Sequence, residues 1–120
     1  MPAKPQKFSI ESRIRFNFGR RIAFGPGKAD LLEQIERTGS ISEAAKAMDM
    51  SYMRAWTLVK SLDRGFVEPL VVKIRGGSAR GGATLSETGH RVLSLYRKME
   101  AASGASTNAA GAQLKQLFKP

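Results

Sequence analysis

Two helical segments separated by a short turn place the strongest constraint on how this chain can fold. The first begins at Ser40 with a capping-box pattern: the Ser40 hydroxyl can accept from the amide of Glu43, and the Glu43 carboxylate can reach back to the amide of Ser40. We expect this helix to run through Met48. Ser51 is a second N-cap candidate, and a longer helix is expected from about Ser51 to about Gly65. Two helices joined in this way are typical of a helix-turn-helix.

The segment before this pair predicts a strand and one further helix. Apolar and polar residues alternate from Ile10 to Phe18, which predicts a strand with one buried face. A helix is expected from about Lys28 to Arg37, because a proline stands just before the apolar stripe. Gly39 is expected to end that helix, since glycine adopts a left-handed cap easily.

Downstream of the pair, the sequence predicts a hairpin and a last helix. Residues 71–74 and 83–85 are expected to form two strands, and between them residues 76–82 hold four glycines in seven positions. A helix opens at residues 86–88 and has an apolar side through Met99. The predicted fold is therefore mainly α with a small β-hairpin wing: a winged helix-turn-helix with an extra N-terminal strand.

The chain is expected to consist of one domain with an extension at each end. Residues 1–8, with their prolines and lysines, predict a flexible basic arm. Residues 9–102 predict the winged helix-turn-helix domain. Residues 103–120 are mostly small and polar at first and predict a flexible tail.

The helix from about 51 to 65 has one apolar side and one basic side when its residues are placed at 100° intervals. In a helix-turn-helix the second helix enters the major groove, and its first residues touch bases. The expected base-contacting residues are Ser51, Tyr52, Met53, Arg54 and Thr57. Lys60 and Arg64 lie further along and are expected to meet phosphates. The alternative is a solvated polar face on an ordinary helix, and for Tyr52 packing is the more common role of a flanking aromatic ring.

The predicted wing, residues 75–83, adds further candidates for DNA contact. Arg75 and Arg80 are basic, and glycine amides can approach and donate to phosphates or enter the minor groove. The alternative is a loop that merely closes the hairpin. Ser42 lies at a helix N-terminus, which favours an anion such as a phosphate, although simple capping needs no ligand.

The composition of the chain indicates what kind of molecule it binds and which classes of protein it does not resemble. The chain has 20 lysines and arginines against 10 acidic residues, a net charge of +10 that points to a polyanion. The absence of cysteine excludes disulfides and thiolate sites. His90 stands alone, so no metal or cofactor is expected, and no arrangement of residues predicts an enzyme. No apolar run reaches the roughly 20 residues of a membrane span, so we expect a cytoplasmic protein associated with the nucleoid.

Residues from about Gly27 to Met99 resemble the DNA-binding domain of the molybdate-dependent transcriptional regulators, the ModE family, which is itself close to the LysR-type domain. The motifs that support this resemblance are Thr38-Gly39-Ser40-Ile41-Ser42, Ser51-Tyr52 with Ala55-Trp56, Gly81-Gly82-Ala83-Thr84-Leu85 and Thr88-Gly89-His90-Arg91.

The resemblance implies a homodimer that binds double-stranded DNA. It implies that Ser51, Tyr52, Arg54 and the wing with Arg80 belong to the DNA-contacting elements, and that the N-terminal strand with the first and last helices forms the dimer. Family members continue into a molybdate-binding domain that we do not expect here, so we expect no tight small-molecule ligand. The leading hypothesis is a sequence-specific transcriptional regulator with a link to molybdate. The alternative is a winged-helix module for protein interaction or dimerisation.

Overall fold

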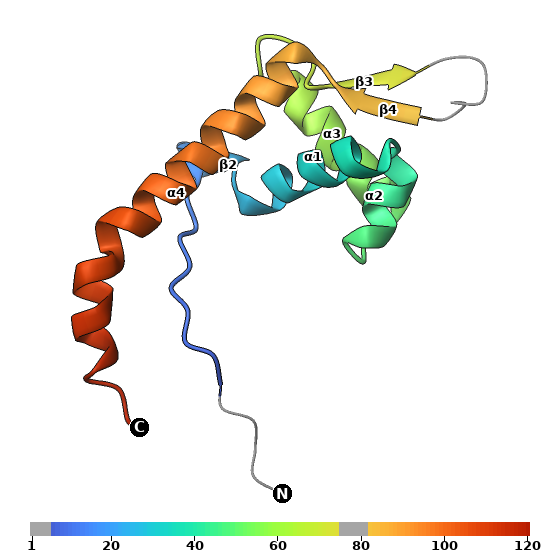
Figure 1. Cartoon of the computed structure of the whole chain (residues 1–120). Coiled ribbons are helices and arrows are strands. Elements are labelled where there is room, and N and C mark those ends of the chain that lie inside the picture. Colours follow the sequence, from blue (N-terminus) through green and yellow to red (C-terminus); the bar gives the residue numbers. More distant parts are fainter. Residues whose placement is uncertain (1–5, 75–81) are drawn as a thin grey trace, which may run out of the picture.

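The computed structural model describes residues 6–74 and 82–120 and has a helical body with two small hairpins (Figure 1). Each hairpin is a two-stranded antiparallel sheet. The prediction of a mainly α fold with a hairpin wing is confirmed. The elements in chain order are β1 (Phe16–Phe18), β2 (Arg21–Phe24), α1 (Pro26–Thr38), α2 (Ile41–Ala47), α3 (Tyr52–Gly65), β3 (Val71–Ile74), β4 (Gly82–Leu85) and α4 (Glu87–Lys115).

The hydrophobic core lies between α1, α2, α3 and the first turns of α4. Leu31 and Ile35 of α1 and Leu62 of α3 are completely buried. Phe24, at the end of β2, contacts Phe66 and Tyr96 edge to face, with ring centroids 5.8 and 5.1 Å apart. Because Phe66 directly follows α3 and Tyr96 lies on α4, this aromatic cluster fixes both helices to the N-terminal hairpin.

The predicted strand from Ile10 to Phe18 is wrong in length and in its buried face. Only Phe16–Phe18 is a strand, and it pairs with β2 across a turn in which Gly19 has a left-handed backbone (φ 63°). Ile10, Phe16 and Phe18 are all exposed. A strand needs a hydrogen-bonded neighbour along its length, and β2 was absent from the sequence prediction and is only 4 residues long.

Residues 6–15 instead run alongside the second half of α4 (Figure 1). The hydroxyls of Ser12 and Ser103 lie 3.0 Å apart, and the side chain of Ile10 lies against Gly111. The hydroxyl of Tyr96 donates to the carbonyl of Ile14 at 2.7 Å. These contacts hold an extended segment against a helix without any strand pairing.

The expected flexible tail from residue 103 differs from the structure, where α4 continues to Lys115. Alanine is the strongest helix former, and it recurs through this half of the helix. Ser103 and Gly111 also face the extended N-terminal segment. Of the expected basic arm, only residues 6–8 are described, and Lys115 places its Nζ 4.9 Å from the ring centroid of Phe8.

The second hairpin is joined to the helical body through β4, and a further backbone hydrogen bond closes its base. The amide of Ala83 in β4 donates to the carbonyl of Gly39 at 2.8 Å, which joins the hairpin to the turn between α1 and α2. At its base, the amide of Ser86 donates to the carbonyl of Leu70 at 2.9 Å. The hairpin is therefore oriented by the same turn that positions α2.

Candidate nucleic-acid interface

Left-handed residues and serine caps determine how α3 is presented. Gly39 ends α1 with φ 78°, and its amide donates to the carbonyl of Ile35 at 2.8 Å. Asp49, in the turn before α3, has φ 57°, a conformation that aspartate adopts more readily than most residues. Ser51 then caps α3, because its Oγ accepts from the amide of Arg54 at 3.1 Å. The tight turn and both predicted stop and start residues are confirmed by these contacts.

The predicted capping box of α2 is half correct. The Oγ of Ser40 accepts from the amide of Glu43 at 2.9 Å. The carboxylate of Glu43 does not reach back; it pairs with Lys46 at 3.4 Å, and the amide of Ser40 donates to the hydroxyl of Thr38 at 3.4 Å. Thr38 thus occupies the place expected for the glutamate. Ser42 lies exposed in the first turn of α2, and its contact with DNA stays a prediction.

The two sides of α3 differ as the periodicity predicts. Ala55, Val59 and Leu62 are buried in the hydrophobic core, on the side of α3 that packs against α2. The opposite side faces solvent, and the side chains at its start include large apolar ones: Tyr52 is 47% and Met53 65% exposed. These side chains are therefore accessible at the start of the helix, on the side opposite the core.

Two polar side chains at the start of α3 face solvent, and one of them is held by a hydrogen bond to the helix backbone. Thr57 is exposed and its Oγ1 donates to the carbonyl of Met53 at 2.8 Å, which leaves its methyl group and oxygen lone pairs outward. Arg54 is exposed one turn earlier. Arginine suits guanine edges and threonine suits thymine methyl groups or base acceptors, so this arrangement can read bases.

Further along α3, the side chains of Trp56 and Lys60 are held by packing more than those at its start. Lys60 is half-buried and its Nζ lies 5.3 Å from the ring centroid of Trp56, a cation–π geometry. Trp56 is itself half-buried, as expected for a packing role. Arg64 is exposed in the last turn. Contact between these two cations and phosphates stays a prediction.

One further basic side chain lies on the wing, within the part of the chain that the structure describes. Lys73 is exposed on β3. Arg75 and Arg80, which the sequence assigns to the DNA-contacting wing, lie outside the described residues.

Three basic residues that the sequence analysis did not assign lie beside the start of α3. Arg13 and Arg15 of the extended segment, Lys28 of α1 and Arg54 of α3 line one hollow of about 410 Å³. The polar positions between Ile10 and Phe18 already placed the two arginines on one parity. Nothing local in the sequence connects them to Lys28 or Arg54.

The described residues offer no other chemistry of comparable strength. Within 6–74 and 82–120 no three histidine or acidic side chains gather as a metal site would require, and His90 lies only beside Glu36, at 3.6 Å. Among the helices of these same ranges, none has the length and apolar character of a bilayer span.

Comparison with curated proteins identifies relatives of this chain. It is 44% identical over 70 residues to the Molybdenum transport protein ModE of Azotobacter vinelandii, covering 58% of this chain and 26% of that protein. It is 37% identical over 86 residues to the DNA-binding transcriptional dual regulator ModE of Escherichia coli K12, covering 72% of this chain and 33% of the relative. The chain thus spans about a quarter to a third of the length of these relatives. No family model matches it.

Solved structures share the fold at low sequence identity. The crystal structure of the CbnR_DBD–DNA complex matches with a TM-score of 0.57 at 19% identity, covering 73% of this chain and 95% of that one. A LysR family transcriptional regulator, VV2_1132, matches with a TM-score of 0.56 at 15% identity, covering 78% of this chain and 30% of that one. These likenesses confirm the winged helix-turn-helix, and the curated relatives confirm the resemblance to ModE proteins.

Proposed function

We propose that this chain, a homologue of ModE proteins over 72% of its length, is a sequence-specific DNA-binding transcriptional regulator that places α3 in the major groove of double-stranded DNA. The observation that supports this most directly is the start of α3. There Arg54 and Thr57 face solvent beside the exposed Tyr52 and Met53, while the other side of the helix is buried. A net charge of +10 adds the electrostatic attraction that phosphates require.

The contacts divide by position along the interface. Tyr52, Met53, Arg54 and Thr57 would meet base edges, because the N-terminal end of a recognition helix approaches the bases. Lys60 and Arg64 would meet phosphates, as would Ser42 at the start of α2. The wing, with Arg75 and Arg80, would follow the backbone or the minor groove. In this function the protein is not an enzyme and acts at the nucleoid.

We further propose that the regulator binds as a homodimer. The aromatic side chains of Phe16 and Phe18 in β1 and the apolar side chains of Leu95 and Met99 in α4 line a hollow of about 370 Å³ that is open to solvent. A second copy of the chain would cover these side chains. Two-fold symmetry then predicts an inverted-repeat site with half-sites about 34 Å, or a multiple, apart. The names of the relatives also support a link between the regulated genes and molybdenum.

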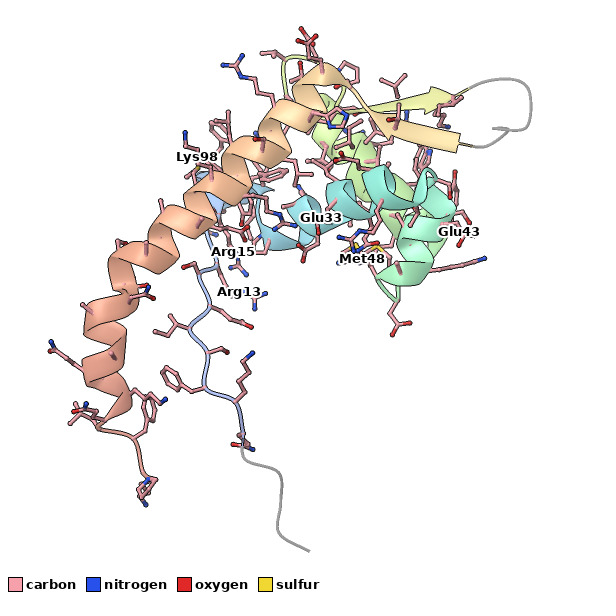
Figure 2. The ribbon with its side chains drawn as sticks, viewed as in Figure 1. Arg13, Arg15, Glu33, Glu43, Met48 and Lys98 are labelled. Carbon is pink, nitrogen blue, oxygen red and sulfur yellow. The ribbon has the colours of Figure 1, made fainter. Side chains whose placement is uncertain are left out.

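Selection of bound genomic fragments followed by sequencing tests the proposal. We expect enrichment of an inverted repeat, and Arg54→Ala should weaken binding to it by about 1–3 kcal/mol while losing discrimination at one base pair. Lys98→Ala is the charge-matched control, because Lys98 lies on the side of α4 away from α2 and α3 (Figure 2). Equal binding of enriched and scrambled duplexes by the unaltered protein would contradict sequence-specific recognition and favour a protein-interaction module.

A further inference from the structure

A hollow whose charged lining residues are all basic, here called the basic hollow, lies where the extended N-terminal segment passes the starts of α1 and α3. The rest of its lining is apolar or glycine and includes Met48, Met50 and Leu58. Its charged side chains are Arg13, Arg15, Lys28 and Arg54, and every one of them is positive. It measures about 410 Å³, ample room for a phosphate group. Four cations that converge from three separate segments require an explanation, because like charges repel.

The geometry of the lining is set by backbone contacts. Lys28 donates from its Nζ to the carbonyls of Ala23 at 3.2 Å and Ile22 at 3.4 Å, which directs its ammonium group toward β2. An ammonium has three donors, so one stays available for a ligand. The Arg15 side chain lies against Gly25, where an added Cβ would be 3.4 Å from Arg15 Cγ.

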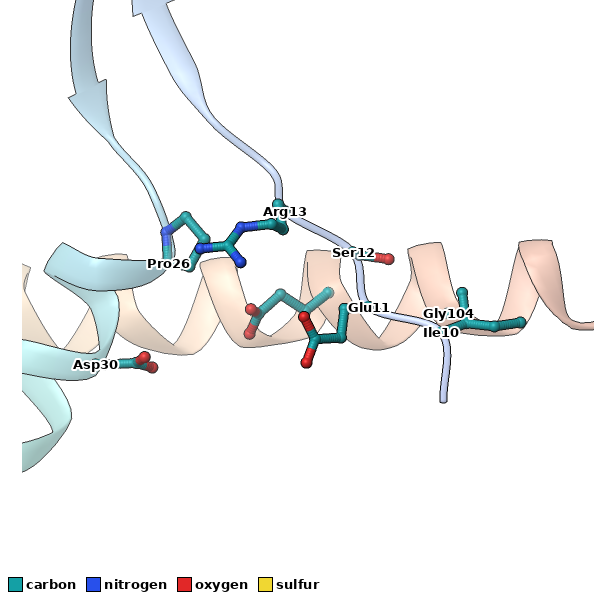
Figure 3. A pocket seen from close by; sticks show the side chains of 8 residues that line it. Ile10, Glu11, Ser12, Arg13, Pro26, Asp30 and Gly104 are labelled. Atoms are coloured by element: carbon teal, nitrogen blue, oxygen red, sulfur yellow. The ribbon is translucent and has the colours of Figure 1, made fainter. Parts of the chain in front are cut away.

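The two arginines of the extended segment project from the same side of it (Figure 2). Figure 3 shows the neighbouring hollow that Arg13 shares with Glu11 and Asp30; there the guanidinium of Arg13 extends toward Pro26, the first residue of α1. That helix end has no side-chain cap and no acidic residue in its first turn. The positive end of the helix dipole therefore adds to the field of the four side chains.

Among the described residues, no acidic side chain lines the basic hollow itself, although Arg13 also borders a neighbouring hollow that Glu11, Asp30 and Glu100 line. None of the four cations forms an ion pair within the described part of the chain, and the nearby acids Asp30 and Glu100 are held by Arg97 at 2.8 and 2.9 Å. Burial lowers the pKa of Lys28 below its ordinary value, and the positive charge of Arg21 lowers it further. The lowered pKa means that the charged form of Lys28 is disfavoured in the free protein, and an anion placed beside it would oppose that shift.

We propose that the basic hollow binds one phosphate group of the DNA backbone at the edge of the major groove that α3 enters. The inference rests on the proposed function and adds a phosphate clamp outside the recognition helix. Arg54 connects the two, because it lies on the exposed side of α3 and also lines the hollow. Phosphates flank the groove on both sides, and such contacts set the register of a protein on DNA.

Salt dependence of binding measures the clamp directly. Each neutralised phosphate adds about 0.9 to the slope of log affinity against log salt concentration. We therefore expect Arg13→Ala combined with Arg15→Ala to reduce the slope by about 0.9, so that between 50 and 200 mM salt the variant loses about 3.5-fold less affinity than the unaltered protein. Because a phosphate contact is independent of sequence, the reduction should be equal on the enriched and the scrambled duplex.

Two controls separate the clamp from general effects. The double change Arg13→Lys with Arg15→Lys keeps the charges and should keep the slope, which excludes misfolding as the cause. Lys98→Ala removes one charge from α4 and should leave the slope unchanged. An unchanged slope in the double alanine variant would overturn the clamp even if DNA binding is sequence-specific. A reduced slope with no preference for the enriched duplex would support the clamp and refute only the proposed function.

A free anion could supply the same chemistry as a backbone phosphate. Titration of the DNA-free protein with inorganic phosphate, followed by the NMR signal of the Lys28 side chain, tests this source. A strong response to inorganic phosphate together with an unchanged salt slope in the double alanine variant would assign the hollow to a small oxyanion and overturn the backbone assignment. A weak response with a reduced slope would support the backbone.

Discussion

The contact between Gly89 and Leu70 provides a sharp test of how α4 is fixed to the wing. Gly89 is buried in the first turn of α4, directly over the backbone where β3 begins. A Cβ at this position would overlap the carbonyl oxygen of Leu70 and lie 3.1 Å from its carbonyl carbon. The obstacle is backbone rather than a flexible side chain, so either α4 or the base of the hairpin must move.

The expected cost of Gly89→Ala follows from three contributions. Overpacking at a tight contact costs about 1–3 kcal/mol. Displacing the Leu70 carbonyl also weakens the hydrogen bond that it accepts from Ser86 at 2.9 Å, worth about 1 kcal/mol. Alanine in place of glycine returns about 1 kcal/mol of helix propensity. We expect a net loss of about 2 kcal/mol, or about 6–10 °C in Tm for a domain of this size.

Urea and thermal unfolding of three alanine variants in the same helix measure the effect. Gly104 has nothing within 4 Å of an added Cβ, so Gly104→Ala should stabilise the protein by about 1 kcal/mol. At Gly111 an added Cβ would meet only the flexible end of Ile10, so that variant should lie between the other two. A Gly89→Ala variant as stable as Gly104→Ala would refute the packing of α4 on the hairpin base.

Three further predictions concern a cap, a buried hydroxyl and a titration. Ser51→Ala removes the N-cap of α3 and should cost about 1 kcal/mol in urea unfolding, whereas Ser42→Ala, at an exposed position, should change stability by less than about 0.5 kcal/mol. Tyr96→Phe removes the 2.7 Å hydrogen bond to Ile14; it should cost about 1 kcal/mol and speed amide exchange in residues 6–15. NMR titration should give Lys28 a pKa below 10.5 in the free protein, and bound DNA should raise it, so binding near that pKa should take up protons.

Local chemistry explains why the helix-turn-helix could be predicted from the sequence. A serine cap and a left-handed glycine act on amides within a few residues, as at Ser51 and Gly39. The predicted hydrogen bond between the Glu43 carboxylate and the amide of Ser40 was wrong for an equally local reason. The hydroxyl of Thr38 accepts from that amide instead.

The N-terminal segment and the second half of α4 were predicted less well, since their conformations depend on each other. Ser12 and Ser103 are far apart in the sequence, and so are Ile10 and Gly111, yet each pair is in contact. Alternation between Ile10 and Phe18 indicated an extended backbone correctly, but periodicity cannot reveal that the neighbour is a helix rather than a strand.

The two parts of the candidate site also differ in how far the sequence alone predicts them. The exposed side of α3 follows from helical periodicity alone, whereas the basic hollow requires the fold to bring Arg13, Arg15 and Lys28 to Arg54. Under the two proposals Arg54 would have two roles, because it would read a base and would also belong to the phosphate clamp. Removing it should reduce both discrimination between sequences and the salt slope, whereas removing Arg13 and Arg15 should reduce the slope alone. If both proposals hold, α3 would determine sequence specificity, and a segment that precedes the helix-turn-helix in the chain would set the register of the protein on the DNA.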